Sequence, residues 1–243
     1  MTPRIIAGHA PVLLLCDHAS SHVPRDIDLG IAPDLLDRHI GVDIGAGALT
    51  LALADALDAP AVLGAVSRLV IDLHREPDHH GLIPPESDGH PIPGNVGADR
   101  FARIARFYTP YHRAIREAVT RFRPALIVAI HSFTPRLESS TAPLRPWHVG
   151  ILSNRDRRAA QPAIESLVAR PSLIVGDNEP YSGRMLNLTL NRHAEARGIP
   201  SFSIEVRNDL IAAAAGVEDW ARIVSETIFH VRNSLAQRGS SAT

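Results

Sequence analysis

The stretch LLLCDHASSHVP, residues 13–24, indicates how this chain folds and where its site lies. An apolar run, Leu13 to Cys16, is followed directly by Asp17 and His18. A run that is apolar throughout is typical of a strand covered on both faces, as in a parallel sheet. Because ligands bind at the carboxyl ends of parallel strands, His18 is placed where a buried strand would deliver it to a metal.

Short apolar runs alternate with longer amphipathic segments along the rest of the chain. The runs that predict strands are 11–16, 59–66, 68–73, 125–130, 148–153, 172–176 and 201–206. Helical spacing covers 43–58, 98–122, 157–169, 189–198 and 217–237, and Pro110 is expected to kink or split the second of these. The alternation predicts one α/β domain, residues 1–243, with a mostly parallel sheet. Segment 74–97 has no periodicity and predicts a long loop that covers a site.

Composition excludes several classes of protein. The formal net charge is −1, which makes nucleic acid an improbable partner, and no apolar run approaches the roughly 18 residues of a membrane helix. All 25 basic residues are arginine, which excludes a lysine Schiff base and a P-loop lysine. Cys16 has no second cysteine to pair with, and no signal peptide is recognisable, so we expect a cytoplasmic protein. The G-x-S-x-G elbow of serine hydrolases does not occur.

Two further predicted strands end in a group that binds metals or protons. The run 125–130 continues into His131, and 201–206 carries Glu205 near its end. Because all three strands belong to one predicted sheet, His18, His131 and Glu205 are expected to meet at its carboxyl edge. Two imidazoles, a carboxylate and an open position form the usual catalytic zinc site, beside which a glutamate can deprotonate water. Taken singly, such a histidine is more often a structural group, and Glu205 would be a surface charge.

Eight blocks of sequence carry a resemblance to a known family. They are CDHASSHVP, HIGVDIGAGAL, SRLVIDLHREPD, IHSFTP, RPWHVGIL, DNEPYSG, TLNRHAEARGIP and IEVRNDLI. In this order, over about residues 11–211, they resemble the N-formylglutamate amidohydrolase family. The resemblance implies a fold similar to zinc carboxypeptidases and aspartoacylase-type deacylases, with a mixed, mostly parallel sheet between helices. It also implies hydrolysis of N-formyl-L-glutamate or a similar acidic N-acyl amino acid.

The resemblance implies a set of metal ligands and a base. His18 and His131 match zinc ligands, and Glu205 matches the general base. Carboxypeptidase-like proteins supply a glutamate three residues after the first histidine, where this chain has Ser21. Asp43 matches an acidic position of the formylglutamate family and is expected to be the third ligand. The alternative for Asp43 is a helix N-cap, and the alternative ligands are Asp17 and His22.

The resemblance also implies how a substrate carboxylate is bound. Arg75, in the run Asp72-Leu73-His74-Arg75, matches an arginine that binds the carboxylate in aspartoacylase-type enzymes, and His74 stands where those enzymes have asparagine. Arg68 is expected to stabilise the oxyanion or hold a second carboxylate, with a salt bridge to Asp72 as its alternative. Further carboxylate-binding candidates are Arg145, Arg184 and Arg207.

The predicted function is that of a metal-dependent amidohydrolase with one Zn²⁺ per chain and an acidic N-acyl amino acid as its small-molecule partner. Iron or manganese in place of zinc, the acyl group and the oligomeric state stay open. The alternatives are a deacylase for a different N-acyl amino acid and a catalytically silent protein that senses such compounds. The block containing Asn178, Glu179 and Tyr181 belongs to the resemblance, but the sequence indicates no chemistry for these three residues.

Overall fold

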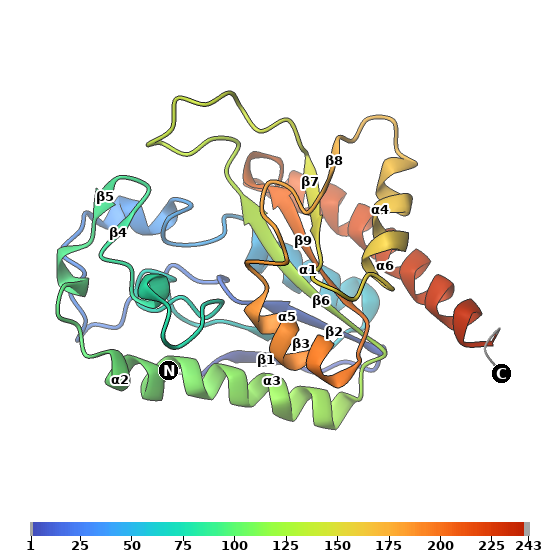
Figure 1. Cartoon of the computed structure of the whole chain (residues 1–243), viewed down its shortest axis with the longest axis horizontal. Coiled ribbons are helices and arrows are strands. Elements are labelled where there is room, and N and C mark those ends of the chain that lie inside the picture. The colour runs from blue at the N-terminus through green and yellow to red at the C-terminus, as the bar shows by residue number, and fades with distance from the viewer. Residues whose placement is uncertain (1, 241–243) are drawn as a thin grey trace.

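The computed structural model describes residues 2–240, and a seven-stranded sheet runs through this part of the chain (Figure 1). The strand order is β1-β3-β2-β6-β9-β7-β8. The strands are β1 Arg4–Ile6, β2 Val12–Cys16, β3 Ala61–Leu63, β6 Leu126–Phe133, β7 Val149–Leu152, β8 Val175–Asp177 and β9 Ser201–Arg207. The neighbours β3, β2, β6 and β9 are parallel, whereas β1 and β7 pair antiparallel with β3 and β9. The predicted mixed, mostly parallel α/β fold is confirmed.

Helices cover both faces of this sheet, and each face has its own apolar layer. One layer contains α1 Ala46–Leu57, α4 Ala160–Val168 and α6 Ala214–Ser240, and the other contains α3 Thr109–Phe122 and α5 Leu188–His193. In Figure 1, α3 runs along the bottom of the view, while α4 and α6 lie to the right. Successive side chains of a strand point to opposite faces, so Leu14 packs in the first layer and Leu15 in the second. This two-sided burial explains why β2 is apolar throughout.

The predicted strand 68–73 is wrong. This segment forms consecutive turns after β3, in which the amides of Val70 and Ile71 bond to the carbonyl of Ser67. The Ser67 hydroxyl accepts a hydrogen bond from the Leu69 amide, which offers the backbone a local partner in place of a strand. Leu69, Val70 and Ile71 are nevertheless fully buried. Their apolar character therefore reflects burial beneath the site and not a place in the sheet.

The expected interruption at Pro110 takes the form of a π-helical turn. α2 Arg100–Arg103 continues through the π turn Ile104–Tyr108 into α3, and Pro110 lies in the first turn of α3. Proline lacks the amide that an α-helix interior requires, and the wider turn before it accommodates the ring. The helix thus stays continuous from Arg100 to Phe122. Within residues 2–240, no helix is long and apolar enough to span a membrane.

Segment 74–97 contains a small hairpin that the sequence pattern did not predict. Its strands are β4 Glu86–Ser87 and β5 His90–Pro91, joined by Asp88 and Gly89. Both turn residues have positive φ, 48° and 79°, as a two-residue type I′ hairpin requires. As expected, much of the segment lies over the site, because the hairpin and the residues before it line the central cavity.

Candidate metal centre and active site

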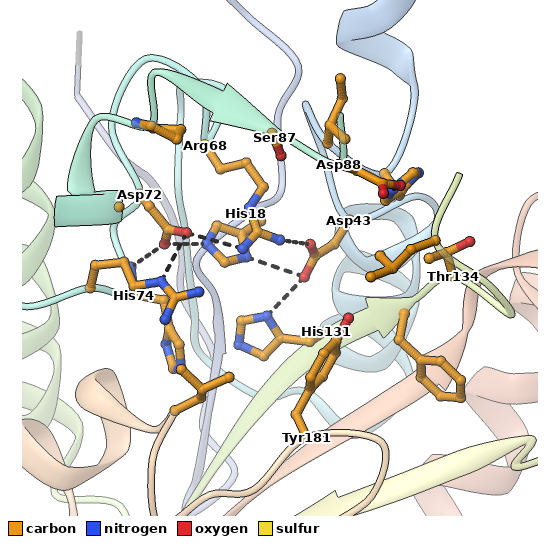
Figure 2. A pocket seen from close by; sticks show the side chains of 18 of the residues that line it. His18, Asp43, Arg68, Asp72, His74, Ser87, Asp88, His131, Thr134 and Tyr181 are labelled. Atoms are coloured by element: carbon orange, nitrogen blue, oxygen red, sulfur yellow. Dashed lines mark hydrogen bonds and ion pairs between the residues drawn. The ribbon is translucent and has the colours of Figure 1, made fainter. Parts of the chain in front are cut away.

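All eight residues predicted for the site line one cavity at the carboxyl edge of the sheet (Figure 2). The cavity has a volume of about 590 Å³. His18 follows β2, Asp43 precedes α1, and His131 of β6 stands opposite Glu205 of the adjacent parallel strand β9. The other four are Arg68, His74, Arg75 and Arg145. The strand-end argument therefore identified three residues, His18, His131 and Glu205, that do come together in space.

His18, Asp43 and His131 form a group that fits a divalent metal ion. Oδ2 of Asp43 lies 3.3 Å from His18 Nδ1 and 2.8 Å from His131 Nδ1, and the two ring centroids are 5.3 Å apart. The three ligand atoms lie within 4.8 Å of one another. All three side chains are buried, yet they face the cavity. Two imidazole nitrogens with one carboxylate oxygen form a donor set that zinc prefers and that leaves a position open.

The alternative role of Asp43 as a helix cap does not occur. α1 has Gly45 as its N-cap residue, with φ of 78° and no side-chain capping bond. The backbone amide of Asp43 bonds to the carbonyl of His18, which turns the carboxylate towards both imidazoles. Burial alone would raise the pKa of Asp43, but His18, His131 and Arg68 lower it below its ordinary value. Asp43 is therefore an anion that faces the two histidines.

Each of the two histidines contacts a second carboxylate through its other nitrogen. Nε2 of His18 lies 2.8 Å from Asp72 Oδ1, and Nε2 of His131 lies 3.2 Å from Asp17 Oδ2. Carboxylates in such positions fix the orientation and tautomer of metal-binding histidines. Burial would raise the pKa of Asp72, but neighbouring His18 and Arg68 hold the pKa of its carboxyl well below the usual range. Both Nδ1 atoms are thereby left to face Asp43.

A second group of possible ligands shares His131 with the first. It consists of Asp17, His74 and His131. Asp17 is fully buried and is absent from the residues that line the cavity, so an ion there would lie away from a bound substrate. Its carboxylate already accepts hydrogen bonds from Thr189 and His74, at 2.8 and 2.9 Å. His22, the other alternative ligand, is exposed and belongs to neither group.

Arg68 is engaged by two buried carboxylates. Its Nη1 lies 3.0 Å from Asp43 Oδ1 and its Nη2 lies 3.0 Å from Asp72 Oδ2. The alternative salt bridge to Asp72 is thus present, together with a second one to Asp43. Burial would lower the pKa of Arg68, but both carboxylates raise it above its ordinary value. Each terminal nitrogen thus donates one N–H to a buried carboxylate, so Arg68 holds both carboxylates in place, while its remaining N–H groups can still donate.

Arg75 and Arg145 remain available to bind an anion. The one salt-bridge contact of Arg75 within residues 2–240 joins its Nε to Asp72 Oδ2 at 3.6 Å, and Arg75 lines the cavity. Nη1 of Arg145 donates to the Thr134 carbonyl at 2.9 Å and to the Tyr181 hydroxyl at 3.2 Å. The other two candidates do not line the cavity: Arg184 is exposed, and Arg207 pairs with Asp209.

Glu205 is a buried carboxyl group in the wall of the cavity. Its side chain lines the cavity beside His131, and its Oε2 atom has no hydrogen-bond partner within residues 2–240. Burial raises the pKa of Glu205 to about 7, although the charge of His131 opposes this rise. A carboxyl group that titrates near neutrality can both accept and return a proton at physiological pH. The structure thus places at the cavity a carboxyl group with a raised pKa, as the predicted general-base role requires.

The imidazole of His74 is fixed by contacts with Asp17 and Thr189. Its Nδ1 lies 2.9 Å from Asp17 Oδ2 and 3.1 Å from Thr189 Oγ1, and its backbone amide donates to Asp72 Oδ1 at 2.9 Å. Because Asp17 can only accept, the Nδ1–H of His74 donates to it, which leaves Nε2 for the cavity. Asp17 therefore supports both His74 and His131.

Two segments meet above the cavity and partly cover it. Asp88, at the tip of the β4–β5 hairpin, accepts hydrogen bonds from the backbone amides of Glu138 and Ser139 at 2.7 and 3.0 Å. The same carboxylate lies 2.7 Å from Nε2 of His39. The hairpin and the segment 134–147 are seen at the upper left of Figure 1, where they approach each other. We call this contact the Asp88 clasp.

Sequence reasoning missed Tyr181 and the supporting roles of Asp17, Asp72 and Thr189. Tyr181 lines the cavity from the loop between β8 and α5, where no strand-end rule applies. Its membership of the block DNEPYSG was the available signal. The supporting contacts join residues far apart in the chain, such as Asp17 and Thr189, and no sequence spacing encodes them.

Comparison with known proteins shows the family to which the chain belongs. The model of the N-formylglutamate amidohydrolase family matches residues 10–212. The crystal structure of a gene product of Agrobacterium tumefaciens is similar, with a sequence identity of 32% and a TM-score of 0.91. This alignment covers 97% of the present chain and 96% of the Agrobacterium chain. The crystal structure of N-formylglutamate amidohydrolase from Ralstonia eutropha is also similar, with a sequence identity of 19% and a TM-score of 0.72. This alignment covers 98% of the present chain and 100% of the Ralstonia chain. A comparison with curated proteins finds no match.

Proposed function

The chain belongs to the N-formylglutamate amidohydrolase family, and on this premise we propose that it hydrolyses the amide bond of an acidic N-acyl amino acid such as N-formyl-L-glutamate. The products are a carboxylic acid, here formate, and the free amino acid. The observation that carries the proposal is the convergence of His18, Asp43 and His131 in the cavity that also contains Glu205. Binding of an acyl amino acid would require arginines, but it would not require a buried base beside a metal-competent group.

We propose zinc as the resident ion, held by His18, Asp43 and His131. Zinc would act as a Lewis acid on the carbonyl and would lower the pKa of water from about 15.7 to about 7. Asp72, which is hydrogen-bonded to Nε2 of His18, and Asp17, 3.2 Å from Nε2 of His131, would hold the two imidazoles in the orientation that ligation requires. Arg68 bridges Asp43 and Asp72 and so keeps both carboxylates ionised and in place.

Glu205 carries the proton during the reaction. As a carboxylate it takes a proton from the water that attacks the acyl carbon, and the new C–O bond makes this carbon tetrahedral. Glu205 then gives the proton to the amine nitrogen as the C–N bond breaks. The proton taken from water thus leaves on the amino acid, and no covalent bond to the protein forms. A pKa of about 7 suits both halves of this cycle at neutral pH.

Arg75 would bind a carboxylate of the substrate through its two terminal nitrogens. His74 and Arg145, which line the same cavity, would contact the remaining polar atoms of the amino acid. The acidic nature of the substrate follows in this proposal from the guanidinium groups on the cavity wall, because carboxylates are the anions that a planar guanidinium binds in bidentate fashion.

Metal analysis and an activity assay test the proposed function. The purified protein should contain roughly one divalent ion per chain and should release formate from N-formyl-L-glutamate. Arg75→Ala should reduce kcat/KM for this substrate far more than for a neutral N-formyl amino acid, whereas Arg184→Ala, at an exposed position outside the cavity, should affect neither. Binding of acyl amino acids without release of any acid, with zinc, iron or manganese supplied, would instead indicate a sensor.

A further inference from the structure

The loop that carries Tyr181 is fixed by close backbone packing. Asn178 has a left-handed backbone with φ of 55°, and its side-chain oxygen accepts hydrogen bonds from the amides of Ser153 and Gly183, at 3.1 and 2.9 Å. A Cβ atom on Gly183 would lie 2.6 Å from the Ser153 amide nitrogen, so only glycine allows this approach. The loop therefore has one defined position against β7.

Two glycines of the sheet hold the same loop from the other side. A Cβ atom on Gly150 or on Gly176 would collide with the carbonyl oxygen of Glu179. Gly150 lies in β7 and Gly176 in β8, so the loop backbone rests directly on two strands. This packing places the Tyr181 ring in the cavity wall, where its hydroxyl points towards the region of His131 (Figure 2).

The Tyr181 hydroxyl retains a proton that it can donate. Nη1 of Arg145 lies 3.2 Å from the hydroxyl oxygen, and the Arg145 guanidinium carbon lies 5.0 Å from the centre of the Tyr181 ring. A guanidinium can only donate, so the phenol oxygen accepts in this bond. Within residues 2–240 the hydroxyl makes no other hydrogen bond, and the group faces the cavity. Burial and the charge of Glu205 raise the pKa of Tyr181, which keeps the phenol protonated.

The proposed reaction needs such a donor. Attack of water on the acyl carbon places negative charge on the carbonyl oxygen, and a donor aimed at this oxygen lowers the barrier. Arg68 already shares its charge between two buried carboxylates, so a second donor aimed at this oxygen would add stabilisation that Arg68 does not supply alone. We infer that Tyr181 is a catalytic residue whose hydroxyl donates a hydrogen bond to the carbonyl oxygen of the substrate as it becomes negative. This inference rests on the proposed function, and Arg145 acts in it as the positioning residue.

The substitution Tyr181→Phe tests this role, because it removes only the hydroxyl. With N-formyl-L-glutamate as substrate, kcat should fall by about 10²–10³-fold, while KM stays within about threefold of wild type. Metal content and thermal unfolding should not change. Tyr108→Phe is the matched control, because Tyr108 also accepts a hydrogen bond from an arginine, Arg192 Nη1 at 3.1 Å, but does not line the cavity.

Binding measurements give a readout that does not depend on turnover. A phosphonamidate analogue of the substrate, whose tetrahedral phosphorus carries charged oxygens, should bind Tyr181→Phe about 10²-fold more weakly than wild type. Glutamate, the product, should bind both proteins equally. A rise in KM with unchanged kcat, equal affinities for the analogue, or an unaltered variant would each overturn the role of Tyr181. A wild-type protein that releases no acid from any N-acyl amino acid would overturn the proposed function and this role together.

Discussion

A single oxygen atom, Oδ2 of Asp43, faces both histidines of the proposed metal centre. This arrangement depends on the orientation of each ring, which the carboxylates behind the rings determine. At the scale of single residues, the supporting carboxylates are therefore as informative as the ligands.

Asp72→Asn should weaken metal binding about 10–100-fold, because the amide cannot replace the charged acceptor at His18 Nε2. Competition with a chromophoric chelator measures this affinity directly. Asp78→Asn, which changes an exposed aspartate a short distance further along the chain, should leave the metal affinity unchanged. Equal affinities of wild type and Asp72→Asn would contradict the supporting role of Asp72.

Glu205→Gln should lower kcat by about 10²–10⁴-fold while metal content and substrate binding stay close to wild type, because glutamine has nearly the same shape but cannot accept the proton. Steady-state kinetics with N-formyl-L-glutamate and metal analysis of the variant test this expectation. Glu86→Gln is a suitable control, because Glu86 lines the cavity but is exposed. If the variant kept more than about a tenth of wild-type kcat, another group would have to be the base.

At this scale the sequence predicted where residues lie better than what they contact. The strand-end rule placed His18, His131 and Glu205 at one edge, because sheet topology alone determines this outcome. The contacts of Arg68 with Asp43 depend on how a turn folds over the sheet, and no local pattern encodes such a contact. The contact of Arg145 with Tyr181 likewise joins two loops that lie apart in the sequence.

At the scale of elements, burial explains both the strands that were predicted correctly and the one predicted strand that does not form. β2 and β6 were predictable because both faces of these strands are buried, which leaves an apolar run over the whole of β2 and over Leu126 to Ile130 of β6. The segment 68–73 has the same composition but folds into turns, since a short apolar run reports burial and not backbone geometry. The β4–β5 hairpin has two-residue strands, too short for alternation to be visible.

The Asp88 clasp joins two elements above the cavity, and Asp88→Ala should release them. The loss removes the acceptor of the Glu138 and Ser139 amides and the partner of His39. We expect faster hydrogen exchange of both amides and a higher KM, with metal content unchanged, because the metal ligands lie on other elements. Asp78→Ala is the control at an exposed site. Unchanged exchange at residues 138 and 139 would show that the clasp does not hold the segment.

At the scale of the whole molecule, a buried histidine pair should make stability depend on pH. Nδ1 of His112 lies 2.8 Å from Nε2 of His193, and Nε2 of His112 lies 3.1 Å from the Leu73 carbonyl oxygen. The carbonyl can only accept, so His112 donates to it through Nε2 and, when neutral, accepts from His193. Burial lowers the pKa of His112 to about 4 and that of His193 to about 3.

The unfolded chain, in which histidine has a pKa near 6.5, therefore binds more protons than the folded chain between about pH 6.5 and pH 4. The free energy of unfolding should fall as the pH falls through this window. Urea unfolding of the metal-loaded protein at pH 6.5 and pH 4.5 should show wild type losing on the order of 2 kcal/mol more than His193→Gln. His230→Gln, at an exposed position on α6, should behave like wild type. Parallel losses in all three proteins would refute the expectation.

The loop that rests on β7 and β8 also limits which amino-acid substitutions the chain tolerates. Gly150, Gly176 and Gly183 have no room for even one added carbon, because each faces backbone atoms that cannot move aside. In a library that samples every substitution under selection for activity, these three positions should be depleted as strongly as the histidines of the site. Mutational sensitivity would then identify the glycines beneath the Tyr181 loop as clearly as it identifies the reacting groups. None of the three glycines, however, carries a side chain that could touch a substrate.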